Sequence, residues 1–221
     1  MMKACLAAVA LFLPAQDSPF NGKDLTGWKP QNAEKSKWKV GKASIDPADP
    51  KRLVLADGAE LVNLAAKHGD SVDLASEAKW GDSVIEVELM VPKDSNSGVY
   101  VMGEYEVQVL DSFGHQKMST GDIGALYGAA PPKVNASKAP GEWQKFVIDF
   151  RAPKFDADGK KTANAKFLKV ELNGQVVQEN VEMKGPTPGG LTGKEAATGP
   201  IMFQGNHGPV AFRNIKITPV K

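Results

Sequence analysis

The sequence predicts an all-β protein built as an antiparallel β-sandwich, and three observations support this fold class. The 22 glycines and 15 prolines divide the 221 residues into short stretches. Between them, apolar and polar residues alternate with a period of two, which is typical of strands with one buried face. No apolar stripe at helical spacing is long enough to support a helical bundle. Many short strands separated by turns indicate a sandwich or a barrel.

Seven segments carry this alternation and are predicted to be strands: residues 83–89, 98–102, 105–110, 143–150, 167–172, 199–204 and 210–218. Asn173-Gly174 predicts a hairpin turn between two apolar runs. Residues 156–159 predict a second turn rather than a calcium loop, because the later ligands of that motif are missing. One or two helical turns are expected at residues 60–67. The long connections 129–140 and 185–200 are expected to form the rim of a functional site.

Length and charge narrow the class of protein. One domain, residues 17–221, is long enough to bury its own core. The 27 basic and 26 acidic residues nearly cancel, so we expect no binding to nucleic acid and a small or neutral ligand instead. No stretch predicts a membrane span. The only cysteine, Cys5, lies near the N-terminus, which excludes disulfides, thiolate metal sites and cysteine nucleophiles from the rest of the chain.

Residues 1–16 have the order of a secretory signal peptide. Lys3 supplies the positive charge, and residues 4–13 form an apolar run that is too short to span a bilayer. Pro14 and Ala15 end this run, with cleavage expected after Ala15. The sequence therefore predicts a secreted or periplasmic protein, and a buried N-terminal helix is the alternative.

One predicted strand presents a polar face. Alternation places Glu104, Glu106 and Gln108 on one side and apolar residues on the core side. This row, on an exposed sheet surface, suits a sugar, because carboxylates accept hydrogen bonds from hydroxyls and amides both donate and accept them. An ordinary solvated face is the alternative. Two carboxylates roughly 6.5–7 Å apart along a strand would also suit a conventional two-carboxylate glycosidase.

Three further positions are candidates for the site. Asp111 lies five positions after Glu106 and joins it only if the strand bends or bulges. His207 lies among glycines that leave room for a ligand, and a neutral imidazole accepts protons near pH 7. Trp143 follows a turn at a strand start, which favours it over the other tryptophans as an aromatic surface for a sugar.

Several segments, in order, resemble the 3-keto-disaccharide hydrolase family. They are residues 20–28 (FNGKDLTGW), 96–100 (NSGVY), 105–111 (YEVQVLD), 127–131, 140–143, 172–174, 199–204 and 212–215. The resemblance covers nearly all of the chain after the predicted signal peptide. It implies a concanavalin A-like jelly roll of two antiparallel sheets and the cleavage of glycosides whose sugar carries a 3-keto group.

The chemistry implied by this resemblance needs a base, an acid and a group that polarises the ketone. The ketone acidifies the C2 hydrogen, so a base removes that proton and the group at C1 leaves by β-elimination; addition of water then gives net hydrolysis. Glu106 or His207 is the expected base, and Asp111 or Glu142 the positioning or proton-donating group. Arg213, or a divalent metal ion with unidentified ligands, would polarise an oxygen.

The remaining expectations concern sugar binding and the alternatives. The expected substrate-binding residues are Asn96, Gln108, Tyr127, Glu142, Trp143, Gln204 and Arg213. Arg213 has a structural alternative, which is an ion pair with a carboxylate such as Asp111. A non-catalytic, lectin-like module and a glycosidase that uses Glu104 and Glu106 are the alternative functions. The oligomeric state is left open.

Overall fold

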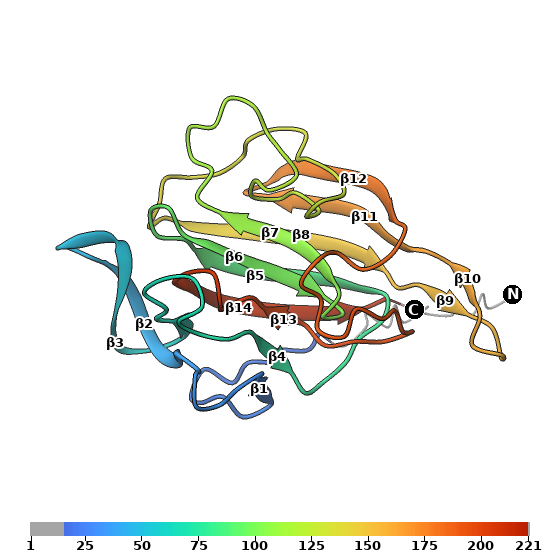
Figure 1. Ribbon diagram of the computed structural model, residues 1–221, viewed down its shortest axis with the longest axis horizontal. Coiled ribbons are helices and arrows are strands. Elements are labelled where there is room, and N and C mark those ends of the chain that lie inside the picture. The colour runs from blue at the N-terminus through green and yellow to red at the C-terminus, as the bar shows by residue number, and fades with distance from the viewer. Residues whose placement is uncertain (1–15, 221) are drawn as a thin grey trace, which may run out of the picture.

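The computed structural model describes residues 16–220, which form two antiparallel sheets packed face to face (Figure 1). The smaller sheet has the order β1 (Trp28–Pro30), β4 (Leu74–Ser76), β13 (Met202–Phe203), β6 (Asn96–Val101) and β7 (Tyr105–Leu110). The larger sheet has the order β12 (Gln175–Met183), β11 (Ala165–Leu172), β8 (Trp143–Arg151), β5 (Ser83–Met90), β14 (Val210–Pro219), β3 (Asp49–Asn63) and β2 (Trp38–Asp46). A separate hairpin pairs β9 (Lys154–Phe155) with β10 (Lys161–Ala163). No helix in this described part is long and apolar enough to cross a membrane.

The all-β sandwich predicted from the sequence is confirmed. The predicted strands lie within two residues of their expected bounds, except that only Met202–Phe203 forms a strand within 199–204. Asn173-Gly174 joins β11 to β12, and the turn at Asp156 joins β9 to β10. The predicted helical turns at residues 60–67 are wrong, because residues 60–63 are the end of β3, where they pair with β2 and partly with β14. The predicted signal peptide lies almost entirely outside the described residues.

Strands β2 and β3 form a long hairpin that the sequence did not predict. They project from the sandwich in Figure 1, and most of the outer part of β3 is exposed on both faces. Period-two alternation arises when one face of a strand is buried. The outer part of β3 therefore lacks the pattern by which the other strands were recognised.

An aromatic stack joins the two sheets. The Phe203 ring on β13 lies 4.0 Å, between centroids, from Phe212 on β14, and 5.3 Å from Trp28 on β1. Trp38 on β2 extends the stack, 6.2 Å from Phe212. The two-residue strand β13 is thus fixed both by its neighbours in the sheet and by rings from the opposite sheet.

Loops cover the free edge of β7. Gln108 exchanges backbone hydrogen bonds with residues 124 and 125, both 2.9 Å long, and the Tyr127 N–H donates to Glu106 O (3.2 Å). Further along, the Thr187 N–H donates to Glu104 O (2.9 Å). Covering an edge in this way prevents pairing with another chain. It also places Tyr127 and Thr187 beside Glu106.

The aromatic stack yields a stability prediction. Phe203→Ala should lower the free energy of unfolding by about 3–5 kcal/mol, because it removes a fully buried ring between the sheets and leaves a cavity. Chemical denaturation measures the change. Val54→Ala is the matched control, because Val54 is 39% exposed and should cost less than about 1 kcal/mol. A loss of less than about 1 kcal/mol for Phe203→Ala would contradict the role given to the stack.

Candidate functional site

The register of β6 and β7 assembles a polar group of side chains. Gly98 pairs with Gln108, and Tyr100 pairs with Glu106. The turn between the strands is made by Met102 and Gly103, which have φ angles of 56° and 71°. Cross-strand partners share a face of the sheet. Tyr100 therefore lies beside Glu106 on the outer face, away from the core.

A cavity of about 230 Å³ lies on this outer face. Its walls are Asn96, Tyr100, Glu106, Gln108, Tyr127, Pro188, Gly189, Gln204 and His207. Pockets for drug-sized ligands occupy roughly 300–1,000 Å³, so this smaller, largely polar cavity suits a ligand the size of a single sugar ring. The cavity brings together six residues that the sequence assigned to the site, namely Asn96, Glu106, Gln108, Tyr127, Gln204 and His207.

The outer face of β7 is covered, which corrects the expectation of an exposed platform. Glu104, Glu106 and Gln108 are only 4%, 2% and 3% exposed. Residues 185–200 fold across the face, and Thr187 Oγ1 accepts the Glu106 N–H (2.9 Å). Gly189 has a positive φ of 79°, and a Cβ there would lie 2.7 Å from Tyr100 Oη. The loop therefore approaches the site closely because it carries glycine.

Glu106 is a buried carboxyl with a raised pKa. Burial raises the pKa of Glu106 to about 8, and the negative charge of Asp73 adds to the shift. The hydrogen bond from Tyr100 Oη to Glu106 Oε2 (2.8 Å) opposes the rise but does not cancel it. A Cβ at Gly98 would collide with Glu106 Oε1, so glycine makes room for the carboxyl. Glu106 is therefore mostly protonated at neutral pH and can donate a proton.

His207 is shifted in the opposite direction. Burial lowers the pKa of His207, the nearby His68 ring lowers it further, and the charge of Asp73 partly opposes both effects. The His207 Nδ1 atom contacts Asn206 Oδ1. The tautomer that donates from Nδ1 to this amide oxygen carries its lone pair on Nε2. His207 is therefore neutral near pH 7 and can accept a proton.

The segment that carries His207 is held by buried polar side chains. Asn63 Nδ2 donates to Gly205 O (2.8 Å) and Gly208 O (2.9 Å). Asp73 Oδ1 accepts the Gly205 N–H (2.9 Å), and burial raises the pKa of Asp73 despite this bond. These contacts fix the turn on both sides of the histidine.

Amide groups in the cavity wall remain available for a ligand. Asn96 Oδ1 is buried and has no hydrogen-bond partner among the described residues. Buried polar atoms are normally hydrogen-bonded, so this acceptor indicates a place for a ligand hydroxyl. Gln108 Oε1 accepts the Val109 N–H (3.0 Å), and Gln204 Nε2 donates to Tyr100 Oη (3.3 Å).

Tyr100, Pro188 and Gly189 line the cavity although the sequence did not assign them to it. Alternation along residues 98–102 does place Tyr100 on the same face as Gly98, which is a signal that could have identified the tyrosine. Pro188 and Gly189 belong to a predicted rim, but no local pattern indicates where a long loop will fold.

Asp111 lies outside the cavity, which corrects its expected place beside Glu106. The pairing of β6 with β7 continues without a bulge to Leu110. The Asp111 carboxylate instead accepts the N–H groups of Asp94 (3.0 Å) and Phe113 (3.3 Å). Its position is that of a turn-stabilising residue at the end of β7.

Trp143, Arg213 and Glu142 also lie away from the cavity, because β8 and β14 belong to the larger sheet. The Arg213 guanidinium lies 3.9 Å from the centroid of the Trp143 ring, on the outer face of that sheet. Arg213 Nε donates to Glu88 Oε2 (2.7 Å), so its carboxylate partner is not Asp111. Glu142 is exposed in the turn before β8.

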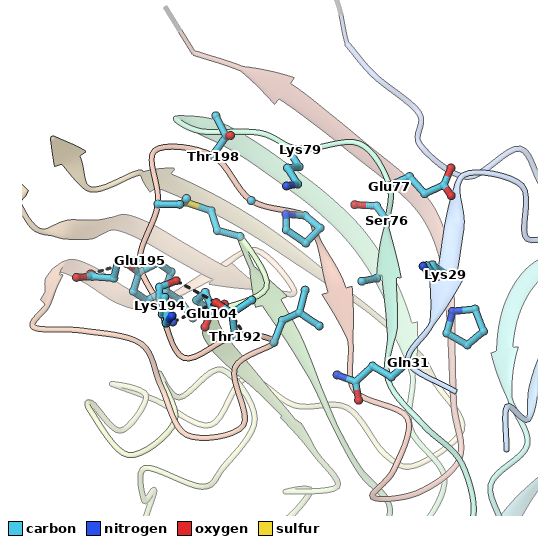
Figure 2. A pocket seen from close by; sticks show the side chains of 18 residues that line it. Lys29, Gln31, Ser76, Glu77, Lys79, Glu104, Thr192, Lys194, Glu195 and Thr198 are labelled. Atoms are coloured by element: carbon cyan, nitrogen blue, oxygen red, sulfur yellow. Dashed lines mark hydrogen bonds between the residues drawn. The ribbon is translucent and has the colours of Figure 1, made fainter. Parts of the chain in front are cut away.

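A larger hollow of about 620 Å³ opens beside the loop 190–200 (Figure 2). Its buried acid, Glu104, accepts the N–H groups of Thr192 (2.9 Å) and Gly193 (3.0 Å) and the Thr192 hydroxyl (2.6 Å). Glu195 is bonded to Tyr105 Oη and Lys161 Nζ, both at 2.6 Å. Both carboxylates hold the loop in place. Glu104 and Glu106 open into different hollows, so they do not form the pair that a conventional glycosidase needs.

The divalent metal ion considered from the sequence has no evident set of ligands. Within residues 16–220, no group of three or more histidine, cysteine, aspartate or glutamate side chains is placed to hold one. The steps proposed below are described for the chain's own acids, bases and amides.

Comparison with solved structures identifies similar proteins from Parabacteroides distasonis, which are assigned as glycosyl hydrolases. One is 28% identical, with a TM-score of 0.72 over 93% of this chain and 84% of that chain. A second is 19% identical, with a TM-score of 0.62 over 93% of this chain and 94% of that chain, and it supports the fold alone. Comparison with curated protein sequences gives no significant match.

The family comparison covers both the fold and the cavity. The model of the 3-keto-alpha-glucoside-1,2-lyase-like domain matches residues 16–218. This range includes every strand of the sandwich except the last residue of β14, and all the residues that line the 230 Å³ cavity. The chain therefore belongs to the family of 3-keto-alpha-glucoside-1,2-lyase-like domains.

Proposed function

We propose that this protein cleaves glycosides of 3-keto sugars by elimination across C1 and C2, followed by addition of water. The observation that carries the proposal is the opposite shift of two pKa values in one sugar-sized cavity. The pKa of Glu106 is raised to about 8, and the pKa of His207 is lowered. Environments that separate two pKa values in this way assign an acid and a base. The family description, a 1,2-lyase acting on a 3-keto-α-glucoside, agrees with this reaction class.

His207 is the proposed base. Its free Nε2 atom takes the proton from C2 of the sugar, which the adjacent ketone has acidified. The electron pair of the C2–H bond moves into the C2–C3 bond, and negative charge develops on the C3 oxygen. Donors that face this oxygen stabilise the charge. The Nε2 group of Gln108 is suited to this role, because the other end of its amide is already fixed by Val109.

Glu106 is the proposed acid. The C3 oxygen then re-forms the ketone, and the electron pair between C2 and C3 moves to form the C1–C2 double bond as the C1–O bond breaks. The electron pair of the C1–O bond leaves with the aglycone oxygen, which takes the proton of Glu106. The hydrogen bond from Tyr100 then stabilises the carboxylate that forms. In the second half of the reaction, the ionised Glu106 removes a proton from water as the hydroxyl adds to C1. Protonated His207 returns its proton to C2, so both residues recover their starting states.

The proposal predicts selectivity for the ketone. Wild-type protein should release the aglycone from a 3-keto-glucoside and leave the unoxidised glucoside intact, measured by chromatography of the products. Glu106→Gln should lower kcat by about 10²–10⁴, because the amide cannot replace a general acid. Glu142→Gln is the matched control and should retain activity, because Glu142 is exposed outside the cavity.

Two results would contradict this assignment. Cleavage of the unoxidised glucoside at a comparable rate would indicate a conventional glycosidase. Binding of sugars without cleavage of either substrate would leave a lectin-like module.

The proposal also predicts a bell-shaped pH dependence. Glu106 must be protonated, so kcat/KM should fall as pH rises through about 8. His207 must be neutral, so activity should also fall below its pKa, which is lower than 6.5. Residual activity of Glu106→Gln, followed from pH 5 to 9.5, should lack the alkaline fall. An activity that keeps rising through pH 8 would show that ionised Glu106 is the base, and would reverse the two roles.

We further propose that residues 1–15 are removed during export. Asp17 already belongs to the sandwich, because it exchanges backbone hydrogen bonds with Ile217 (2.7 and 2.8 Å) and its carboxylate accepts from Trp80 Nε1 (3.0 Å). Cleavage after Ala15 would therefore leave the fold complete. Intact-mass measurement of protein from the periplasm or medium should give a chain that starts at Gln16. Full-length protein confined to the cytoplasm would contradict export.

A further inference from the structure

Asp73 is a buried carboxylate that the proposed reaction does not use. It is 6% exposed and lies directly before β4. Its Oδ1 atom accepts the Gly205 N–H (2.9 Å), and the Asn206 N–H is a second donor to the carboxylate. Both donors belong to the turn that leads into His207. None of the ion pairs among residues 16–220 includes Asp73, so no basic side chain neutralises its charge.

The register of the smaller sheet places Asp73 on the same face as Glu106. One row of paired residues crosses β4, β13, β6 and β7 and packs into the core: Leu74, Phe203, Val99 and Val107. Asp73 and Glu106 each directly precede a member of this row, so both side chains lie on the outer face.

The Glu106 carboxyl also leans towards the strand that Asp73 contacts. A Cβ at Gly98 on β6 would collide with Glu106 Oε1, so the carboxyl lies over β6 rather than over its own strand. Gly98 O in turn accepts the Gln204 N–H (2.9 Å), and the next residue after Gln204 is the Gly205 that Asp73 binds. The two carboxyl groups therefore approach each other from either side of the end of β13.

The charge of Asp73 acts on the proposed acid and base in the same direction. A negative charge favours the protonated form of each neighbouring group. It adds to the rise in the pKa of Glu106 that burial causes, and it opposes the fall in the pKa of His207. Burial raises the pKa of Asp73 itself, while the two backbone N–H donors favour its ionised form. The turn that Asp73 positions thus helps to keep its charge.

His68 acts on His207 from another side and has the opposite effect. Its exposed ring meets the His207 ring edge-on, with 4.5 Å between the centroids. A positive charge on His68 disfavours a second one on His207 and lowers its pKa. The titratable groups that face the acid–base pair are therefore Tyr100 and Tyr127 near Glu106, His68 near His207, and Asp73 near both.

We propose that Asp73 is a positioning residue for both members of the acid–base pair. Its carboxylate fixes the turn that carries His207, and its negative charge acts on Glu106 and His207 together. This inference deepens the function proposed above and rests on it for the roles of the two residues. Loss of the charge makes both groups release their protons more readily. It therefore moves the active pH range as a whole towards acid pH and does not narrow it.

Titration of the free protein tests this without a substrate. NMR follows the imidazole C–H signals and the carboxyl carbons of isotope-labelled glutamate, and the signals of His207 and Glu106 are identified by their loss in His207→Gln and Glu106→Gln. Asp73→Asn keeps an acceptor for the Gly205 N–H and should lower both pKa values by about 1 unit. His68→Phe keeps a ring against His207 and should raise the pKa of His207 alone.

Asp111→Asn is the matched control, because the Asp111 carboxylate also accepts two backbone N–H groups but lies outside the cavity. It should leave both pKa values unchanged. Asp73→Ser is a second uncharged variant and should show the same two shifts as Asp73→Asn.

The pH profile of kcat/KM for a 3-keto-glucoside gives the kinetic readout. Both limbs should move to lower pH in Asp73→Asn and stay in place in Asp111→Asn. A fall in kcat with both pKa values unchanged would leave Asp73 a purely structural residue and overturn the proposal, as would a shift of only one of the two pKa values. Both shifts in a protein that cleaves no keto substrate would support the role of Asp73 and refute the proposed reaction.

Discussion

The site depends on one carboxyl group that is buried on the outer face of a sheet. Desolvation disfavours the charged form of Glu106, and one donor, Tyr100 Oη at 2.8 Å, is too little to restore its ordinary pKa. Neighbouring residues keep the Glu106 carboxyl buried. Gly98 leaves space for the carboxyl, and Pro188 and Gly189 cover it from the outside. An acid that holds its proton at neutral pH follows from this burial and does not need a charged neighbour, although Asp73 adds to the effect.

Glu104 shows that a similarly buried carboxyl can instead have a structural role. It lies two residues before Glu106 and is nearly as buried, at 4% compared with 2% exposed. Its two oxygens, however, accept three hydrogen bonds from Thr192 and Gly193. These hydrogen bonds tie the side chain to the covering loop. The two glutamates therefore differ in the number of hydrogen-bond donors around them. Glu104, which has more donors, holds the loop that covers Glu106.

The sequence predicted the sandwich and much of the cavity because both depend on period-two alternation. Glu106 and Gln108 share a face by that rule, and the glycines around His207 marked an accessible turn. The rule is local, so it could not show which sheet a strand joins, and Trp143 and Arg213 were therefore placed in the wrong part of the molecule. It also fails where neither face or both faces of a strand are buried, as in the outer part of β3. The path of residues 185–200 depends on distant partners such as Glu104.

The relative position of the proposed acid and base is set by the backbone of the smaller sheet. Glu106 belongs to β7, and His207 follows β13, so the two are joined through β6: Tyr100 pairs with Glu106 on one side and with Met202 on the other. Beyond Phe203 the same pairing continues as a hydrogen bond from Gln204 N to Gly98 O (2.9 Å). Phe203 points into the aromatic stack, while its neighbour Gln204 lines the cavity. A shift of this short strand would therefore disturb the core and the geometry of Glu106 and His207 together, so the proposed chemistry requires a rigid core.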